Sequence, residues 1–385
     1  MHTLLRRLLV AFTLLPMSAG AQIQDLGSEA TLDVATWNIE WFGHSSNGPS
    51  NVDTQVANVL DIINGSGIDL WAVQEIANPD RFDELLSLLP TYWRGELASV
   101  SGQQRIGYLW DTRVLTLRLS THILTSQSTA FAGRPPLKAE FTVTLPDTSF
   151  VVTFINVHMK AFADLSSYNR RVDAAKRIKN HIDFTSLASE PVVFLGDFND
   201  EMEASTYNAQ PSPYVPFIED TADYSVLTLP LEAAGGASFQ SGSFLDHIVV
   251  TNEMTDLWLE GSTRVATSLV SVNSFYARTS DHLPVVASFG PSTVTSSEEA
   301  LTPDRALLSD PWPNPAMGPV SVEYSGTDRN ARIQVVDALG RVISDQMVSR
   351  GINRIDVPRG ATGLFFIRLL GPEGAHTRPL LLVGN

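Results

Sequence analysis

The sequence contains no cysteine among its 385 residues. A chain without cysteine forms no disulfide bonds and offers no thiolate, which excludes a cysteine nucleophile and a cysteine-ligated zinc site. Positive charge is also scarce: 26 Lys and Arg oppose 42 Asp and Glu, for a formal net charge of −16. Such a surface does not attract nucleic acid or anionic membranes broadly, although a bound metal ion and a few local cations can still hold a phosphate.

Long apolar runs are missing as well. The chain begins with a short basic segment that includes Arg6 and Arg7, followed by an apolar stretch over residues 8–15 and the small residues Ala19-Gly20-Ala21. This order is typical of a signal peptide, and the stretch is shorter than the roughly 18 residues that a membrane span requires. We therefore predict a signal peptide over residues 1–21 and an exported mature chain without a transmembrane segment.

Strand-like and helix-like patterns alternate over residues 30–290, which predicts one large α/β domain with layered sheets and flanking helices. The expected strands are residues 32–37, 69–73, 106–110, 139–145, 150–157, 192–195, 246–250 and 285–289, and the expected helices are residues 52–63 and 166–184. Residues 291–311 are rich in Ser, Thr and Pro and predict a linker. Residues 312–385 contain short strand patterns separated by turn signals, which predict a small all-β sandwich.

The segment Gly196-Asp197-Phe198-Asn199-Asp200 follows directly on the apolar run of residues 191–195. Side chains two apart on an extended backbone point the same way, so we expect Asp197 and Asn199 to project together from the end of a buried strand. A carboxylate that accepts a proton would then lie beside an amide that donates hydrogen bonds. An Asx-rich turn that only closes the strand is the structural alternative.

Polar residues stand at the ends of five other predicted strands. These segments are Thr36-Trp37-Asn38-Ile39-Glu40, Gln74-Glu75, Asn156-Val157-His158, Asp246-His247 and Ser280-Asp281-His282-Leu283-Pro284. Each alone is compatible with an ordinary loop, but together they suit metal-assisted cleavage of a phosphate ester. A hard cation such as Mg²⁺ needs few oxygen ligands, and a carboxylate can orient or deprotonate the attacking water. The sequence has no Gly-rich P-loop and no His-Glu-x-x-His motif.

In this order, the six segments resemble those of the endonuclease/exonuclease/phosphatase (deoxyribonuclease-I-like) superfamily over residues 32–289. The resemblance implies a four-layered α/β sandwich of two packed mixed β-sheets flanked by helices, with the active site across the top of the sheets. It also implies that Glu75 is the main metal ligand, with Asn38 beside it and Asp281 as a further carboxylate. The implied cofactor is Mg²⁺, with Mn²⁺ as a possible substitute and Ca²⁺ as a possible structural ion.

The resemblance further implies that Asp197 positions or activates the water and that Asn199 holds a phosphoryl oxygen. His158 and His282 would contact the scissile phosphate, while Asp246 would fix the charge or tautomer of His282.

Cations near these segments are the expected contacts for substrate. Arg134 resembles a phosphate-contacting arginine of the deoxyribonucleases, with a surface turn arginine as the alternative, and Lys160 follows the His158 segment. The next predicted helix has a basic face that either steers a polyanion or is an ordinary solvated face; its members are Arg170, Arg171, Lys176, Arg177 and Lys179. The tyrosine that many of these nucleases carry before strand 106–110 has no clear equivalent, because Gln103 and Gln104 stand there and Tyr108 lies inside the strand.

The tail resembles the C-terminal sorting domain of type IX secretion substrates. The resemblance rests on Asn314-Pro315, Val335-Val336-Asp337-Ala338-Leu339-Gly340-Arg341 and Gly363-Leu364-Phe365-Phe366-Ile367-Arg368-Leu369. It implies export through the periplasm and outer membrane by the type IX machinery, and a secreted or surface-attached product. A carbohydrate-binding or adhesion module is the alternative.

From these features we expect a secreted, monomeric, Mg²⁺-dependent endonuclease that hydrolyses extracellular DNA, with RNA as a further substrate. The alternative is a phosphoesterase that acts on a lipid headgroup or small phosphate ester, as sphingomyelinases and inositol phosphatases do. A catalytically silent binding module would have lost one or more of the main site residues, and none is missing.

Overall fold

The computed structural model describes residues 23–99, 102–291, 308–309, 311–325, 331–337, 341–357, 361–371 and 374–383. The chain divides into two compact units, Met1–Thr293 and Val294–Asn385. The predicted signal peptide, residues 1–21, and most of the predicted linker, residues 291–311, lie outside the described residues. Within the described part of the chain, no helix is both long and apolar enough to cross a membrane.

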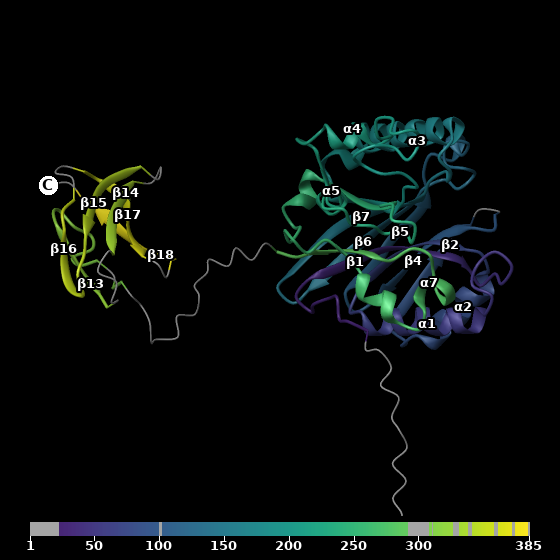
Figure 1. The fold of residues 1–385 in the computed structure, drawn as a ribbon, viewed down its shortest axis with the longest axis horizontal. Helices are drawn as coiled ribbons and strands as arrows, with labels where there is room; N and C mark the ends of the chain where they lie inside the picture. The colour runs from purple at the N-terminus through teal and green to yellow at the C-terminus, as the bar shows by residue number, and fades with distance from the viewer. Residues whose placement is uncertain are drawn as a thin grey trace, which may run out of the picture. The chain divides into compact units, whose positions relative to one another are not determined.

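The first unit contains two six-stranded sheets (Figure 1). One has the order β11-β12-β1-β2-β4-β3 and the other the order β5-β6-β7-β8-β10-β9. The strands are β1 Leu32–Phe42, β2 Leu70–Ile76, β3 Trp93–Leu97, β4 Arg105–Asp111, β5 Leu115–His122, β6 Leu137–Leu145, β7 Thr148–His158, β8 Val192–Asp197, β9 Tyr224–Val226, β10 Asp246–Thr251, β11 Arg264–Val265 and β12 Val285–Phe289. Both sheets are mixed, because the pairs β1–β2 and β7–β8 are parallel and the other neighbours are antiparallel.

Helices cover the outer face of each sheet. In Figure 1, α1, α2 and α7 lie below the sheet that contains β1, and α3 and α4 lie above the sheet that contains β7. The helices are α1 Val52–Gly65, α2 Pro79–Leu88, α3 Leu165–Asp183, α4 Val215–Ile218, α5 Leu229–Ala233, α6 Asn252–Thr255 and α7 Phe275–Arg278. Each long helix begins at a residue whose side chain accepts hydrogen bonds from the first turn, namely Asn51, Asn78 and Asp164.

Three apolar clusters correspond to the three interfaces between these four layers. One fills the space between the sheets, with Phe141 and Phe154 among its members. A second packs α1 and α2 against the β1 sheet, and a third packs α3 against the β7 sheet. The two mixed sheets and their flanking helices confirm the predicted four-layered sandwich.

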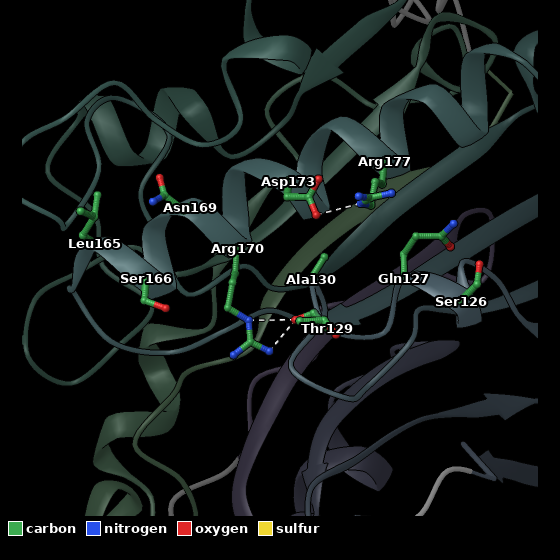
Figure 2. A pocket seen from close by; sticks show the side chains of 10 residues that line it. All are labelled: Ser126, Gln127, Thr129, Ala130, Leu165, Ser166, Asn169, Arg170, Asp173 and Arg177. Carbon is green, nitrogen blue, oxygen red and sulfur yellow. Dashed lines mark hydrogen bonds and ion pairs between the residues drawn. The ribbon is translucent and has the colours of Figure 1, made fainter.

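Three of the five cations on the predicted basic face of α3 pair with carboxylates within the protein. Arg171 is fully buried, and its Nε donates to Asp200 at 2.9 Å. Lys179 pairs with two carboxylates, those of Asp183 and Asp220. On the face shown in Figure 2, Arg177 pairs with Asp173, and the guanidinium of Arg170 donates to the carbonyl of Thr129. The prediction grouped Arg171 with the other basic residues of this face, whereas the structure buries it against Asp200.

Gly196 has to be glycine because β7 and β8 approach closely at this position. Its φ is +146°, and a Cβ atom there would lie 2.1 Å from the carbonyl oxygen of Val157. The parallel pair therefore stays in register up to its last residues, His158 and Asp197. This register determines where both side chains lie.

The second unit is a small antiparallel β domain, as predicted. It has a two-stranded sheet of β13 and β16 and a four-stranded sheet in the order β15-β14-β17-β18. Their bounds are β13 Val320–Tyr324, β14 Arg332–Asp337, β15 Val342–Met347, β16 Gly351–Ile355, β17 Gly363–Gly371 and β18 Gly374–Leu382. Apolar side chains such as Val322, Ile333 and Ile367 form its core.

At the ends of β1 and β2 away from the predicted site, the structure makes stability depend on pH. Burial, with the charges of Asp33 and Asp111, raises the pKa of Asp69 to about 8. The unfolded chain loses this proton near pH 4 whereas the folded protein keeps it, so the free energy of unfolding falls as the pH rises from about 4 to 8. Asp69→Asn keeps an oxygen acceptor for the N–H of Asp33. We predict that the gain in free energy of unfolding caused by this substitution is at least about 1 kcal/mol larger at pH 8 than at pH 5.

Denaturant unfolding at both pH values measures this difference. Asp61→Asn, at an exposed position of α1, is the matched control and should shift stability equally at both. If Asp69→Asn changed the free energy of unfolding equally at pH 5 and pH 8, the burial argument would be contradicted.

Candidate active site

Strand register brings the predicted segments to one edge of the two sheets. Asp197 at the end of β8 lies opposite His158 of β7 on one side and Asp246 of β10 on the other. In the other sheet, Asn38 of β1 lies opposite Gln74 of β2, so Glu75 follows next to it. Segments from both sheets therefore converge at this edge.

The segment before β12 joins them through a chain of hydrogen bonds. The hydroxyl of Ser280 donates to the carbonyl of Asn38 at 2.6 Å and accepts from the N–H of His282 at 3.0 Å. The indole N–H of the buried Trp37 donates to the carbonyl of His282 at 3.0 Å. The position of His282 is thus set by contacts with the end of β1.

Both strands that carry predicted metal ligands are irregular at this edge. The β1–β2 register shifts between Asn38 and Phe42, and the β2–β4 register shifts between Val73 and Ile76. Glu75 has a left-handed backbone with a φ of +61°. Such conformations cost about 1–3 kcal/mol and gather at functional sites. At these irregular positions, side chains take directions that regular strand alternation would not give them.

Asp197 is the centre of the site and is almost fully buried, with 1% of its surface exposed. Its Oδ2 accepts from the Nδ2 of Asn38 at 2.9 Å, a bond that links the two sheets, and from the Nδ2 of Asn199 at 3.0 Å. The Nε2 atom of His158 lies 3.5 Å from the same oxygen. Burial raises the pKa of Asp197, so its carboxylate is a better proton acceptor than an exposed one.

Asn199 forms a turn and belongs to the site at the same time. Its backbone N–H donates to Oδ1 of Asp197 at 2.9 Å, which makes an Asx turn, and its φ is +53°. Its side-chain amide also donates to the carbonyl of Met159 at 3.3 Å. Asn199 therefore orients Asp197, and its contact with a phosphoryl oxygen stays a prediction.

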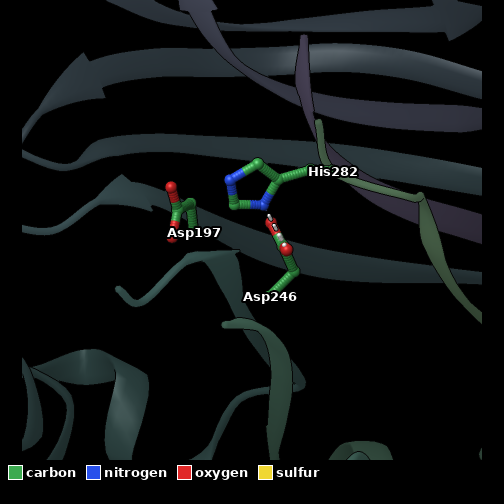
Figure 3. A group of neighbouring side chains, drawn as sticks. All are labelled: Asp197, Asp246 and His282. Carbon is green, nitrogen blue, oxygen red and sulfur yellow. Dashed lines mark hydrogen bonds and ion pairs between the residues drawn. The ribbon is translucent and has the colours of Figure 1, made fainter. Parts of the chain in front are cut away.

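His282 and Asp246 form a buried ion pair. The Nδ1 atom of His282 is 2.7 Å from Oδ2 of Asp246. Figure 3 shows this contact, with Asp197 on the other side of the imidazole ring. Burial disfavours the imidazolium, but the charges of Asp246, Asp197 and Asp281 raise the pKa of His282 to about 10. The side chain of His282 is thus a cation with Nδ1 held by Asp246.

Two residues of the loop before β10 support this pair and were not predicted. The hydroxyl of Ser238 donates to the same Asp246 oxygen at 2.7 Å, and the ring of Phe239 packs on the imidazole with centroids 4.8 Å apart. Neither follows a strand-end pattern, so the sequence offered no signal for them.

Three carboxylates on the other side of the site are near enough for their charges to affect one another: Glu75, Asp281 and Glu40. Glu75 Oε2 accepts from the N–H of Trp41 at 3.0 Å. Burial, followed by the charges of Asp281 and Glu75, raises the pKa of Glu40 to about 7, and burial also raises the pKa of Asp281. Glu40 was absent from the predicted ligands, although its spacing of two from Asn38 was a signal that could have found it.

The donor chemistry of this cluster fits a hard divalent cation. Glu75, Asp281 and the amide oxygen of Asn38 are all oxygen ligands, the type that Mg²⁺ prefers. One ligand atom each of Asp197, Asp246 and His282 also lie within 4.8 Å of one another. In that second group the Nδ1 atom of His282 is bonded to Asp246, which leaves its Nε2 atom to face an ion.

The imidazole of His158 faces the carboxylates of Glu75 and Asp197, and its backbone carbonyl accepts from Arg134. Its Nε2 is 3.7 Å from Glu75 Oε1, and burial, with the charge of Arg134, holds its pKa well below the usual range. Arg134 donates to the carbonyls of His158 at 3.3 Å and Met159 at 3.1 Å, and to Gln104 Oε1 at 2.9 Å. Arg134 is therefore fixed at the rim of the site, and Gln104 helps to hold it.

Two polar residues of the matching segments, and Tyr108 of β4, are structural. Gln74 and Asn156 are fully buried and bond to each other at 2.9 Å across the two sheets. Tyr108 is buried in the core between the sheets, and its hydroxyl donates to the carbonyl of Leu137 at 2.9 Å. Tyr108 therefore does not replace the nuclease tyrosine at the site.

Comparison with known proteins identifies both parts of the chain. Residues 35–282 match the model of the Endonuclease/Exonuclease/phosphatase family. Residues 311–382 match the secretion system C-terminal sorting domain, which directs export by type IX secretion, so the protein is secreted or held at the cell surface. No curated protein matches the sequence.

Solved structures agree with the fold. An endonuclease/exonuclease/phosphatase from Bacteroides vulgatus is 17% identical, with a TM-score of 0.50 over 67% of this chain and 98% of that one. D. rerio TDP2 complexed with a single-strand DNA product is 13% identical, with a TM-score of 0.50 over 68% of this chain and 99% of that one. Since the family model covers more than half of the sequence, the chain is a phosphoesterase that belongs to the Endonuclease/Exonuclease/phosphatase family.

Proposed function

We propose that the protein is a Mg²⁺-dependent endonuclease that hydrolyses extracellular DNA, and RNA by the same chemistry. The observation that carries this proposal is the arrangement around Asp197, a buried carboxylate that lies 3.5 Å from His158. Asn38 and Asn199 orient it through hydrogen bonds. A proton acceptor is thus fixed among groups that can bind a phosphate.

Each polar side chain has a definite task in this reaction. Asp197 takes a proton from the attacking water, and its raised pKa favours that step. The imidazolium of His282, held by Asp246, donates to a phosphoryl oxygen as negative charge builds there. His158, neutral because of its burial, offers a further ring N–H on the same side as Asp197.

The acidic residues make a metal ion necessary for binding a phosphate diester. Glu40, Glu75, Asp281 and Asp197 would otherwise repel it. Asn38, Glu75 and Asp281 would hold Mg²⁺, which supplies charge neutralisation for the phosphoryl and leaving oxygens. Glu40 adds a third carboxylate to the same cluster.

Support for a nucleic acid substrate comes from two sources. Arg134 and Lys160 lie beside His158 at the rim, where they can contact neighbouring phosphates. D. rerio TDP2, which has a similar fold, was solved with a single-strand DNA product. A lipid headgroup or small phosphate ester is the competing substrate, because the same groups would cleave it.

A substrate panel tests this proposal. The purified protein should cleave plasmid DNA and RNA in Mg²⁺ or Mn²⁺ and lose this activity in EDTA. Sphingomyelin and inositol phosphates should be cleaved far more slowly. Cleavage of either while DNA stays intact would overturn the nuclease assignment.

Removing the proton acceptor or the imidazolium should slow turnover strongly without unfolding the protein. We predict that Asp197→Asn and His282→Ala each lower kcat by about 10²–10⁴-fold, the usual contribution of a positioned acid or base. Steady-state cleavage rates measure this effect, and circular dichroism checks folding. Asp53→Asn, at an exposed carboxylate of α1, is the control. Activity within a few-fold of the wild type in either site variant would refute the roles assigned here.

Glu75→Gln tests the metal site directly. The change keeps the shape and removes one negative charge, so we predict that the Kd for Mg²⁺ or Mn²⁺ rises at least about tenfold, as even outer-shell changes cause at metal sites. Titration calorimetry measures binding without relying on turnover. Glu29→Gln, an exposed position outside the site, should bind the ion like the wild type. An unchanged affinity for the ion in Glu75→Gln would show that Glu75 is not a ligand and that the metal binds at other residues.

A further inference from the structure

The loop that follows β7 presents an aromatic ring to solvent close to the active site. Phe162 is 72% exposed, whereas most large aromatic side chains of this unit are buried. The Nζ atom of Lys160 lies 4.4 Å from the centre of its ring. Phe162 comes four residues after His158, so their Cα atoms are at most about 14 Å apart. Both Phe162 and Lys160 are thus within reach of groups that flank a phosphate bound at His158.

This exposed position is held in a strained backbone conformation. The φ of Phe162 is +81°, a left-handed value that costs a bulky residue about 1–3 kcal/mol. Exposing an apolar ring to water also gives no gain in stability. The folded protein therefore maintains an arrangement that is unfavourable in isolation, as is common where a ligand binds.

A buried arginine maintains the loop. Arg171 of α3 donates through Nη1 to the carbonyls of Lys160 at 2.7 Å and Phe162 at 2.9 Å. Its Nε is paired with Asp200 at 2.9 Å, and both side chains are fully buried. Since Asp200 follows Asn199 by one residue, this ion pair ties the loop to the same turn that orients Asp197.

Positive charge gathers on this side of the site. Arg134 donates to the carbonyl of His158, and Arg170 lies near enough for its charge, after the effect of burial, to lower the pKa of both Arg134 and Lys160. Figure 2 shows Arg170 reaching from α3 to the carbonyl of Thr129. The opposite side carries the carboxylates. A ligand that lies along the cationic side would meet charges for its phosphates and a flat ring for an apolar group.

We propose that Phe162 and Lys160 form a stacking subsite for an unpaired base next to the bound phosphate. This inference rests on the proposed nuclease function. Bases stack on aromatic side chains in proteins that bind single strands, and cations beside the ring hold the backbone. In a duplex the faces of the bases are already stacked on each other. The enzyme therefore prefers single-stranded or locally opened nucleic acid over fully paired DNA.

A lipid surface is the competing occupant of this loop. Leu165, 55% exposed, is the next large apolar side chain along it. Two apolar side chains bury little area in a membrane, and the carboxylate of Asp164, which caps α3, stands between them in the sequence. Insertion of both side chains would bring this negative charge to the lipid headgroups, which disfavours contact with an anionic surface. The adjacent cations, Lys160 and Arg134, instead suit a strand that carries a phosphate at every nucleotide.

Phe162→Ala tests the subsite, with a second exposed ring as the control. On single-stranded DNA we expect kcat/KM to fall roughly ten- to hundredfold, the loss seen when a stacking ring is removed, while Phe162→Trp keeps activity. A strand with abasic sites next to the cleaved bond should be cut equally by Phe162→Ala and wild type. Phe184→Ala removes an 81% exposed ring at the far end of α3 and should change neither rate.

A spectroscopic measurement separates stacking from general damage. The fluorescence of a 2-aminopurine base in a single strand should be quenched by the wild type and by Phe162→Trp, and not by Phe162→Ala. An equal loss of activity on normal and abasic strands, or unchanged quenching, would overturn the subsite. Loss of binding to sphingomyelin-phosphatidylcholine vesicles in Phe162→Ala, with DNA cleavage intact, would assign the loop to lipid and overturn it too. If the wild type cleaves no polynucleotide, the nuclease function itself fails, and the subsite with it.

Discussion

The burial of several carboxylates at one edge is the constraint on which the rest of this site depends. Two sheets bring Asp197, Asp246, Glu75, Asp281 and Glu40 to one edge, where burial raises the pKa of several of them. Such a cluster is stable only with compensating cations and hydrogen bonds. The imidazolium of His282 and the amides of Asn38 and Asn199 compensate one half. The other half, with Glu75, Asp281 and Glu40, is where we propose that a divalent cation binds.

The fold separates structural polar contacts from reactive ones. Gln74 and Asn156 lie in the same strands as Glu75 and His158, yet they bond to each other across the sheets and are fully buried. Their bond and the one from Asn38 to Asp197 hold the strand ends of the two sheets together. The candidate site residues can therefore have strained backbone conformations, as Glu75 does, because these hydrogen bonds fix the neighbouring strand ends.

Sequence patterns predicted the layers and the strand ends well, since buried strands are short apolar runs and the polar residues at their ends are easily seen. The Asp197 and Asn199 pair is an example, although an Asx turn rather than strand alternation brings the two together. Contacts that depend on tertiary geometry escaped prediction. Ser238 reaches Asp246 from a loop without a pattern, and Arg171 looked solvated because burial beside Asp200 is decided by packing.

The central claim is that the metal ion lies at the carboxylates of the β1 sheet, while Asp197, Asp246 and His282 are left for water and phosphate. Anomalous diffraction from Mn²⁺-soaked crystals tests it most directly. The account predicts a strong peak bounded by Asn38, Glu75 and Asp281, with the hydrogen bond from His282 to Asp246 intact. A sole peak among Asp197, Asp246 and His282, with that bond broken, would contradict it.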